Sequence, residues 1–592
     1  MKFIYLLSVI FLLVSFLLFK KSNQKESIIS SVIYTIGLFY CYNIVIVLIS
    51  HYLKIDGSLF SLSIFNYLIG SIISLITYKN KEKQKYYFKK EELFVVLIVI
   101  FIGLLVSIVR FRGFTAIAYE SGDSSIHYLS AKHFSRELDL LTKTNSVDPM
   151  YGSFDKQMPI SNINGGLLIN LLSFIKSYWV YIGFDIFNFI LTSLVFVITL
   201  FKIFEKKKVN YTYLTVISLL YSLGFPLNNL IFGFAYLGLS IMVFNLLLLT
   251  ILNIEDFNKN KIYNMIIITI LTLSIFYSYY LFMPGIYLAL GIYYINLWKK
   301  KKIDFKTMFV YGIITLIIPF TIGFCYFILY QFLDADKGNI FTHVNLWGYI
   351  YDNKTPLIVF IIMLIYSWYS FIYKKEEKID YLNLNFIINS LFILLFCILY
   401  ILRLSEIYYL YKFFYLYWIF IIIIFAKKMI KYDYVVYIMF GIICFTSLCV
   451  YMYPTSNLSS QLKTFNIYNW NSYAYGDYRI LFEGEEIDLM EETVKYQDEC
   501  LYNDEFLMFG WNLRNLWFYS ITNGIPKAGH ITGFATQLQQ PNLGFEAWDT
   551  EYPNHQCAVY YYEGNYVNPE VLGYEVLYKN KVGAILKRYE KD

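Results

Sequence analysis

Runs of apolar residues long enough to cross a lipid bilayer recur along most of this chain. A helix needs about 18 to 25 apolar residues to cross a hydrocarbon core of ~30 Å, and stretches of that length follow one another from Lys2 to Tyr453. Of the 592 residues, 58% are apolar and 16% are charged, whereas soluble domains carry about a quarter of charged residues. The sequence therefore predicts an all-α polytopic membrane protein.

We expect about fourteen transmembrane helices separated by polar connections. The predicted spans are 3–19, 28–50, 58–78, 93–110, 177–201, 210–227, 229–252, 262–278, 281–298, 308–332, 356–373, 383–402, 408–426 and 433–453. Three regions result. Residues 1–92 hold the first three spans and a basic loop, and residues 93–453 form the rest of the membrane core. We expect residues 454–592 to form a small α/β domain.

The lysines predict how the chain is oriented in the membrane. The odd-numbered connections carry 26 lysines, whereas the even-numbered connections carry far fewer basic residues. The positive-inside rule then places every odd connection in the cytoplasm, and both the N-terminus and the C-terminal domain outside it. The first span lacks a small-residue cleavage site, so we expect it to be retained. Because the lysines serve orientation, the net charge of +6 does not indicate nucleic-acid binding.

Few charged residues lie inside the predicted spans, and such residues usually mark ion or proton pathways. Asp185 is the clearest case, and we interpret it as a carboxylate near the outer end of its helix that reaches the interface. This pattern disfavours a coupled transporter.

The first large external loop, residues 111–163, holds the candidate catalytic group. Gly122 precedes a stretch with helical spacing, so a helix is expected to begin at Asp123 or Ser124. Asp123 and His127 would then lie about one turn apart on one side, with Glu120 just upstream. A carboxylate beside an imidazole suits a general base that deprotonates a hydroxyl. The alternative is that Asp123 is only a helix cap and that the histidines are ordinary interfacial residues.

Metal binding is a weaker hypothesis for the function of the same loop. Glu120, Asp123, His127 and His133 could supply oxygen and nitrogen ligands, but they match neither HExxH nor a compact acidic pair. We predict no tightly bound metal, and a divalent cation remains open as a cofactor.

The loop sequence ESGDSSIHYLSAKHF, followed by the short apolar stretch NGGLLINLLSFI and a full span, resembles the GT-C superfamily of membrane glycosyltransferases. The resemblance implies that Asp123 is the catalytic base and that His127 neighbours it. The stretch RLSEIYYLYKFFYLYW resembles the place where such enzymes carry a basic residue for the carrier phosphate, here Arg403 or Lys412. The alternative for both is a side chain that snorkels from a helix end. In many members the acidic loop follows the first span, whereas here three more spans precede it.

This resemblance implies a sugar donor linked to polyprenyl phosphate and a glycan, lipid or protein acceptor at the outer face of the membrane. Glu120, His127, His133 and His343 would line the substrate site beside the basic residues. The tail sequence GYEVLYKNKVGAILKRY resembles the closing strand pair of large members. Two other functions stay open, a polysaccharide polymerase or ligase and a lipid or glycan exporter. In the tail, Cys500 and Cys557 are candidates for a disulfide in an oxidising compartment.

Overall fold

The computed structural model describes most of the membrane part and the framework of the C-terminal domain. The described residues are 1–19, 26–55, 57–79, 86–138, 159–326, 361, 365, 381–403, 407–463, 466–476, 480–496, 507–509, 517–518, 520–521, 556–562 and 573–589.

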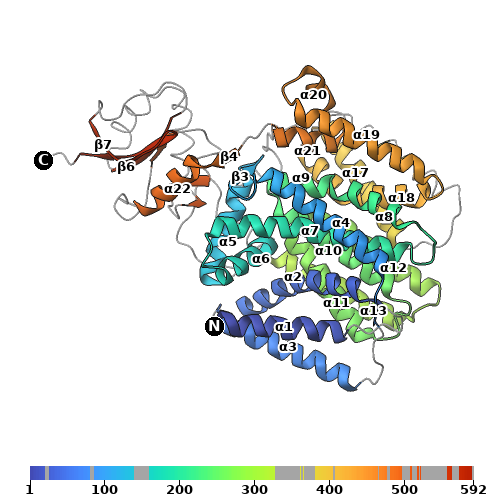
Figure 1. Cartoon of the computed structure of the whole chain (residues 1–592). Helices are drawn as coiled ribbons and strands as arrows, with labels where there is room; N and C mark the ends of the chain where they lie inside the picture. Colours follow the sequence, from blue (N-terminus) through green and yellow to red (C-terminus); the bar gives the residue numbers. More distant parts are fainter. Residues whose placement is uncertain are drawn as a thin grey trace.

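The membrane part is a bundle of apolar helices (Figure 1). Its helices are α1 (Lys2–Phe19), α2 (Ile28–Tyr52), α3 (Leu59–Lys79), α4 (Lys90–Arg110), α7 (Ser177–Ile203), α8 (Tyr211–Ser222), α9 (Phe225–Phe232), α10 (Ala235–Asn253), α11 (Lys261–Ser278), α12 (Met283–Lys299), α13 (Phe305–Gly312), α14 (Ile318–Tyr326), α17 (Tyr381–Ile401), α18 (Ile407–Met429) and α19 (Asp433–Met452). A 3₁₀ turn, η2 (Tyr280–Phe282), precedes α12, and a π-turn, η3 (Ile313–Ile317), joins α13 to α14.

The prediction of a polytopic all-α membrane protein is confirmed. Eleven helical segments of the described chain are long and apolar enough to cross a membrane, and the stretches Lys2–Leu17 of α1 and Leu59–Leu75 of α3 are shorter apolar segments. The predicted span 356–373 lies outside the described residues except for 361 and 365. The total of fourteen spans therefore stays a prediction.

Helices α7 and α10 form the centre of the bundle, where nearly every side chain is buried. Helix α19 and the outer face of α4 expose large apolar side chains, as expected for surfaces that face lipid. Small polar groups lie between the central helices, for example Thr192, which donates to the carbonyl of Gly238 at 3.2 Å. Such contacts replace the hydrophobic driving force that helices lack inside a bilayer.

The two ends of the bundle differ in what they carry. The N-terminus and the C-terminal domain lie toward the end of the bundle that carries α5 (Asp123–Glu137) and α6 (Pro159–Leu171) (Figure 1). At the other end, β1 (Glu26–Ser27) pairs in parallel with β2 (Tyr86–Tyr87) and joins the first two lysine-rich connections. The sequence predicts the same arrangement, because it assigns the lysine-rich connections to one side of the membrane and the N-terminus, the loop 111–163 and the C-terminal domain to the other.

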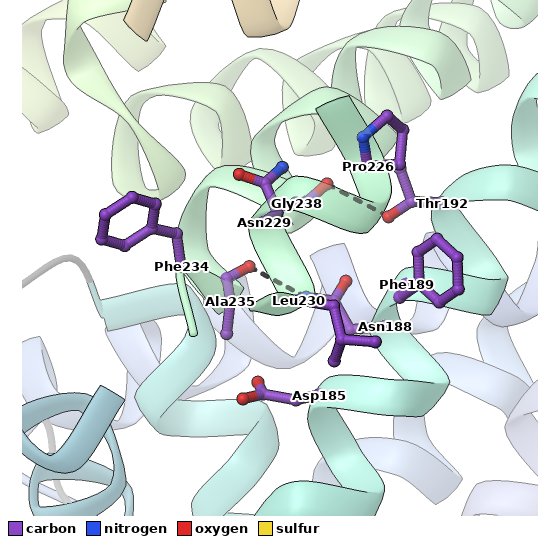
Figure 2. A pocket seen from close by; sticks show the side chains of 10 residues that line it. All are labelled: Asp185, Asn188, Phe189, Thr192, Pro226, Asn229, Leu230, Phe234, Ala235 and Gly238. Atoms are coloured by element: carbon purple, nitrogen blue, oxygen red, sulfur yellow. Dashed lines mark hydrogen bonds between the residues drawn. The ribbon is translucent and has the colours of Figure 1, made fainter. Parts of the chain in front are cut away.

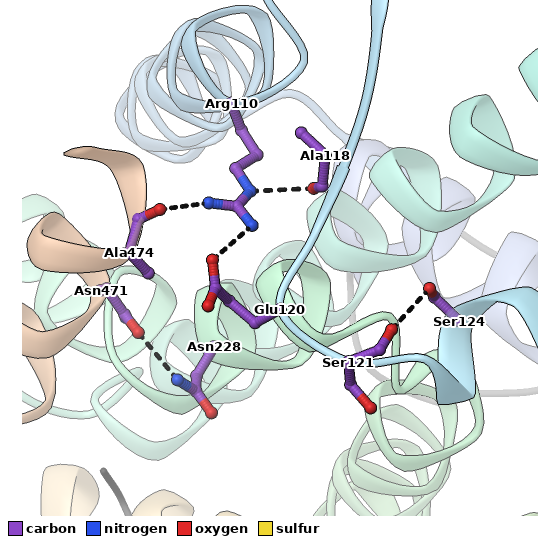
Figure 3. A network of polar contacts seen from close by, with 8 residues as sticks. All are labelled: Arg110, Ala118, Glu120, Ser121, Ser124, Asn228, Asn471 and Ala474. Carbon is purple, nitrogen blue, oxygen red and sulfur yellow. Dashed lines mark hydrogen bonds and ion pairs between the residues drawn. The ribbon is translucent and has the colours of Figure 1, made fainter. Parts of the chain in front are cut away.

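Arg110, at the end of α4, ties the bundle to the first external loop (Figure 3). Its guanidinium donates to the carbonyl of Ala118 at 2.9 Å, to the carboxylate of Glu120 at 3.0 Å and to the carbonyl of Ala474. Ala118 belongs to β3 (Ala116–Tyr119), which pairs antiparallel with β4 (Ile480–Glu483) of the tail. One buried cation thus joins a membrane helix, the loop and the C-terminal domain.

The tail forms the predicted α/β domain. After α20 (Asn457–Leu462) and α21 (Ile467–Gly476), helix α22 (Glu485–Lys495) packs on a four-stranded sheet in the order β5-β6-β8-β7. The strands are β5 (Leu507–Phe509), β6 (Cys557–Tyr561), β7 (Tyr574–Lys579) and β8 (Gly583–Arg588). The last two form the predicted antiparallel closing pair. Cys557 is disulfide-bonded, and its predicted partner, Cys500, lies outside the described residues.

The substitution Glu120→Leu tests how much the Arg110 junction contributes to stability. The side chains of Arg110 and Glu120 are 0% and 5% exposed, and removal of one partner of a buried ion pair costs about 3 kcal/mol or more. We therefore expect a clearly lower midpoint of thermal unfolding for the purified protein in detergent.

The matched control is Glu483→Leu. Glu483 pairs with Arg112, and both side chains are 42% exposed, so its loss is expected to cost at most about 1 kcal/mol. Equal midpoints for the two variants would show that the Arg110 junction is not a structural anchor.

Candidate functional site

The candidate site is built around the first turn of α5, which begins at Asp123 as the sequence predicts. The Asp123 amide donates to the Ser121 hydroxyl at 3.1 Å, and the Ser125 hydroxyl donates back to the carbonyl of Gly122 at 2.6 Å. These local hydrogen bonds fix the helix start. Asp123 as a whole residue is partly accessible, whereas Ser124 and Ser125 are fully buried. The carboxyl group of Asp123 is itself shielded from water by the surrounding protein.

A glycine turn holds the first turn of α5 in place. Helix α9 ends at Phe232 and is capped by Gly233, whose φ of +72° is left-handed, and α10 begins at Ala235. A Cβ atom at Gly233 would lie 2.3 Å from the Cβ of Ser124, so a larger residue cannot occupy this position without displacing α5. The turn also brings Phe234 and Tyr236 beside α5 and α18.

Lys412 of α18 is fully buried and meets the aromatic residues of this turn. Its Nζ donates to the hydroxyl of Tyr236 at 3.1 Å and lies 3.3 Å from the ring centroid of Phe234. The face of an aromatic ring attracts a cation, and more strongly where water is excluded. The alternative that Lys412 snorkels to the interface is therefore wrong.

Asp123 and Lys412 act on each other electrostatically. Burial raises the pKa of Asp123 above its ordinary value, and the positive charge of Lys412 opposes this rise. His127 lies on the same side of α5, and its ring centroid is 4.9 Å from that of Tyr236. The predicted residues His127 and Lys412 thus meet at Tyr236, and the charge of Lys412 acts on the third predicted residue, Asp123.

The remaining predicted site residues lie in other surroundings. Glu120 is engaged by Arg110. His133 lies farther along α5, where burial and the charges of Arg136 and Lys132 lower its pKa to about 4, so it supplies no positive charge at neutral pH. Arg403 is exposed, just after the end of α17. His343 lies outside the described residues.

Trp517 of the C-terminal domain packs directly against the site. Its ring stacks between those of Tyr119 and Tyr128, at centroid distances of 5.7 Å and 5.5 Å, and its indole nitrogen donates to the Ser124 hydroxyl at 3.2 Å. Lys132 of α5 donates to the carbonyls of Ser520 and Ile521 at 3.1 Å and 2.7 Å. The C-terminal domain therefore holds α5 from the side opposite the membrane core.

Asp185 does not reach the interface, contrary to the prediction. It is 3% exposed, and one oxygen of its carboxylate accepts a hydrogen bond from the hydroxyl of Tyr119 at 2.8 Å. Tyr119 also stacks on Trp517, so its hydrogen bond to Asp185 helps to fix the stack of aromatic rings that packs against α5. A pattern of single residues could not reveal this contact, because Tyr119 lies in a loop that the sequence does not place relative to α7.

Sequence reasoning missed Gly233, Phe234 and Tyr236. They lie in the stretch FGFAYLG, which falls inside the predicted span 229–252, whereas the structure breaks the helix between Phe232 and Ala235. The glycine between two aromatic residues is the one feature that could have indicated a tight turn.

Within the described ranges, no group of three His, Cys, Asp or Glu side chains could hold a metal ion. The arrangement is instead an acid–base group beside a buried cation. It can accept a proton at Asp123 and stabilise negative charge near Lys412.

Comparisons with known proteins return structural similarities only. No protein-family model matches the chain, and no curated protein sequence matches it. The chain is similar to the Archaeoglobus fulgidus oligosaccharyltransferase in its apo form, with a TM-score of 0.47 and 12% identity over 80% of this chain and 70% of that one.

It is also similar to ArnT from Cupriavidus metallidurans bound to undecaprenyl phosphate, with a TM-score of 0.45 and 10% identity over 84% of this chain and 97% of that one. At such identities and TM-scores these similarities decide nothing about the activity, substrates or partners of this chain.

The substitution Gly233→Ala tests the close contact at the start of α5. A methyl group there meets the Cβ of Ser124 at 2.3 Å and forces a left-handed φ on alanine. We expect α5 to shift, with exposure of Trp517 and a red shift of its fluorescence relative to the wild-type protein. Because other tryptophans also emit, the emission of Trp517 is obtained as a difference. The spectrum of each protein is compared with that of the same protein carrying the additional substitution Trp517→Phe.

The matched control is Gly183→Ala, because a Cβ atom at Gly183 would meet no atom within 4 Å. An unchanged Trp517 spectrum in Gly233→Ala would contradict the proposed tight packing.

Proposed function

We propose that this chain is a membrane glycosyltransferase that moves a sugar from a polyprenyl-phosphate carrier to an acceptor hydroxyl or amide. The observation that carries the proposal is Lys412, which is fully buried in a membrane helix and whose positive charge acts on the carboxylate of Asp123. Charged residues inside membrane helices are costly, so a retained lysine there is a functional candidate. Its neighbour is the residue predicted from the sequence to be the base.

The proposed reaction uses the two groups in complementary roles. Asp123 accepts the proton of the acceptor nucleophile while that nucleophile attacks the anomeric carbon of the donor sugar. The bond from the anomeric carbon to the phosphate oxygen breaks, and the phosphate leaves with the carrier lipid. Lys412 stabilises the charge that develops on the phosphate. Transfer in this manner inverts the anomeric centre.

The location of the site suits a donor that stays in the bilayer. Lys412 belongs to a membrane-spanning helix, whereas Asp123 belongs to the external loop. A lipid-linked donor would bring its phosphate and sugar to this boundary without a fold for binding a nucleotide. His127 and Tyr236 present aromatic and polar edges to such a sugar.

We further propose that the site faces the outside of a plasma membrane. The lysine-rich connections support this orientation, and so does the disulfide at Cys557, because disulfides persist in oxidising compartments. The C-terminal domain borders α5, so an acceptor glycan, lipid or protein would reach Asp123 beside it.

The first test is replacement of Asp123 by Asn in cells that lack the wild-type protein. We expect the wild-type gene to restore a surface glycan component that the deletion removes, and the Asp123→Asn variant to lose about 100-fold or more of that activity. The measurement is the sugar composition of the cell surface, with the amount of protein in the membrane determined for each variant.

The matched control is Glu205→Gln, which alters an exposed carboxylate paired with Lys202 at the opposite end of the bundle. It should restore the glycan fully. Full restoration by Asp123→Asn would instead favour an exporter or a polymerase that works without this base.

The second test is the pH profile of transfer by purified protein. Burial raises the pKa of Asp123, so the active deprotonated form should be lost at a higher pH than for an ordinary aspartate as the solution is acidified. Lys412→Met removes the charge that opposes this rise. We expect lower activity and an acid limb shifted to higher pH.

Arg403→Gln is the comparator for Lys412→Met, because Arg403 is the other basic residue predicted to meet the phosphate and is exposed. It should leave the acid limb unchanged. A shift in Arg403→Gln, and none in Lys412→Met, would move the phosphate site from Lys412 to Arg403.

A further inference from the structure

An open cleft where α12 ends and α13 begins is large enough to hold a ligand. Its volume is about 490 Å³, and it lies at the end of the bundle that carries the lysine-rich connections. By contrast, the hollow between α7, α9 and the start of α10 has a volume of about 10 Å³, which is room for about one water (Figure 2). Of these two hollows, the cleft is therefore the candidate for a further binding site.

Two connections that are distant in sequence build the cleft. The described residues that line it are Asn258, Trp298, Lys301, Lys302, Ile303 and Asp304. Nδ2 of Asn258 donates to the carbonyl of Lys302 at 2.9 Å, and the hydroxyl of Tyr311 donates to the carbonyl of Phe257 at 3.2 Å. These hydrogen bonds tie the connection after α10 to the connection after α12, so the walls of the cleft are held in one arrangement.

The end of α12 brings two lysines to the cleft. The amide of Lys301 donates to the carbonyl of Trp298 at 2.8 Å, and the amide of Lys302 donates to the carbonyl of Leu297 at 2.9 Å. This pair of hydrogen bonds is the Schellman arrangement, in which glycine usually takes the left-handed position that Lys301 occupies here with a φ of +57°. Neither lysine forms an ion pair with a described residue. A lysine held in a strained conformation indicates that its charge has a use.

The charge around the cleft favours an anion. Residues 254–261 and 299–306 hold seven lysines and three acidic residues. Asp304 is the acidic residue among the described lining, and its carboxylate accepts a hydrogen bond from the Thr307 amide at 2.7 Å at the start of α13. The N-terminus of a helix compensates a carboxylate in this position. The surplus of positive charge therefore remains for a bound anion.

An exposed apolar stripe on α12 leads from the membrane to the cleft. Leu288, Ile292 and Ile295 lie on one face of the helix and are 51%, 38% and 43% exposed. The stripe ends at Trp298 in the cleft, whose ring contacts that of Phe305 at a centroid distance of 5.7 Å. At a rise of 1.5 Å per residue, the stripe from Leu288 to Trp298 is about 15 Å long, which is the thickness of one hydrocarbon leaflet. The occupant therefore combines an anionic group with an acyl chain.

We propose that this cleft binds the phosphate headgroup of one anionic phospholipid, with an acyl chain along the stripe on α12. The lipid belongs to the leaflet at the lysine-rich end of the bundle, which is the cytoplasmic leaflet in the proposed orientation. Lys301 and Lys302 pair with the phosphate oxygens, and Trp298 lies at the headgroup level, as tryptophans at membrane interfaces do. Basic pockets between membrane helices on the cytoplasmic side bind headgroups of this kind. The binding does not depend on the proposed transferase activity.

The test is lipid binding and thermal unfolding of the purified full-length protein in detergent. Native mass spectrometry counts the bound lipids during titration with phosphatidylglycerol, or with phosphatidylcholine that carries the same acyl chains. Glycerol 3-phosphate is added in a third series as the headgroup without chains. We expect one phosphatidylglycerol per chain to bind at concentrations where phosphatidylcholine does not, and the midpoint of unfolding to rise by at least about 2 °C with phosphatidylglycerol only.

The double substitution Lys301→Gln with Lys302→Gln is expected to weaken this binding about tenfold or more. The matched control is Lys207→Gln with Lys208→Gln, which removes two exposed lysines from the connection after α7 without touching the cleft, and it should bind like the wild-type protein. Lys301→Gly separates binding from folding, because glycine adopts the left-handed φ without strain. It should weaken the binding while the midpoint without lipid does not fall.

Equal binding of phosphatidylglycerol and phosphatidylcholine by the wild-type protein overturns the proposal. Equal losses in the two double variants overturn it as well, because they would show attraction to a basic surface rather than to this cleft. A rise in the midpoint that glycerol 3-phosphate reproduces would assign the cleft to a soluble phosphate compound and not to a lipid.

Discussion

The buried ammonium group of Lys412 is the constraint on which the candidate site depends. A cation withdrawn from water into a membrane helix must recover its lost hydration from the surrounding protein. Here the compensation comes from the ring of Phe234, the hydroxyl of Tyr236 and the carboxylate of Asp123. Because these groups belong to three different segments, the segments can only pack in arrangements that keep them around the same nitrogen atom.

Other contacts hold the segment that carries Asp123. Arg110 joins the membrane helix before the loop to Glu120, and Gly233 allows the turn to lie directly on Ser124. From the outer side, Trp517 fills the space between two tyrosine rings. The catalytic candidate is thus supported from the membrane, from the loop and from the tail, which limits its freedom to move.

Local patterns predicted much of this structure. The glycine and the helical spacing after it indicated a helix that starts at Asp123 or Ser124, and the alternation near the C-terminus indicated the last two strands, which the structure has at 574–579 and 583–588. The alternation of lysine-rich and lysine-poor connections predicted that the N-terminus and the C-terminal domain lie at the same end of the bundle as the loop 111–163. These features depend on residues that are neighbours in sequence, where helix caps and strand alternation act.

The sequence alone could not predict contacts between residues that lie far apart along the chain. Lys412 and Tyr236 are 176 positions apart, and nothing near either residue shows that they meet. The same limit explains Asp185, which looked like an interfacial residue until its partner in β3 was known. The insertion of Trp517 also bears on how the protein is made. Trp517 comes after every membrane helix of the described chain, so the packing around Asp123 is completed only when this later segment has been synthesised and has folded against α5. A chain interrupted before Trp517 would keep its membrane helices but would lack the ring that fills the space between Tyr119 and Tyr128.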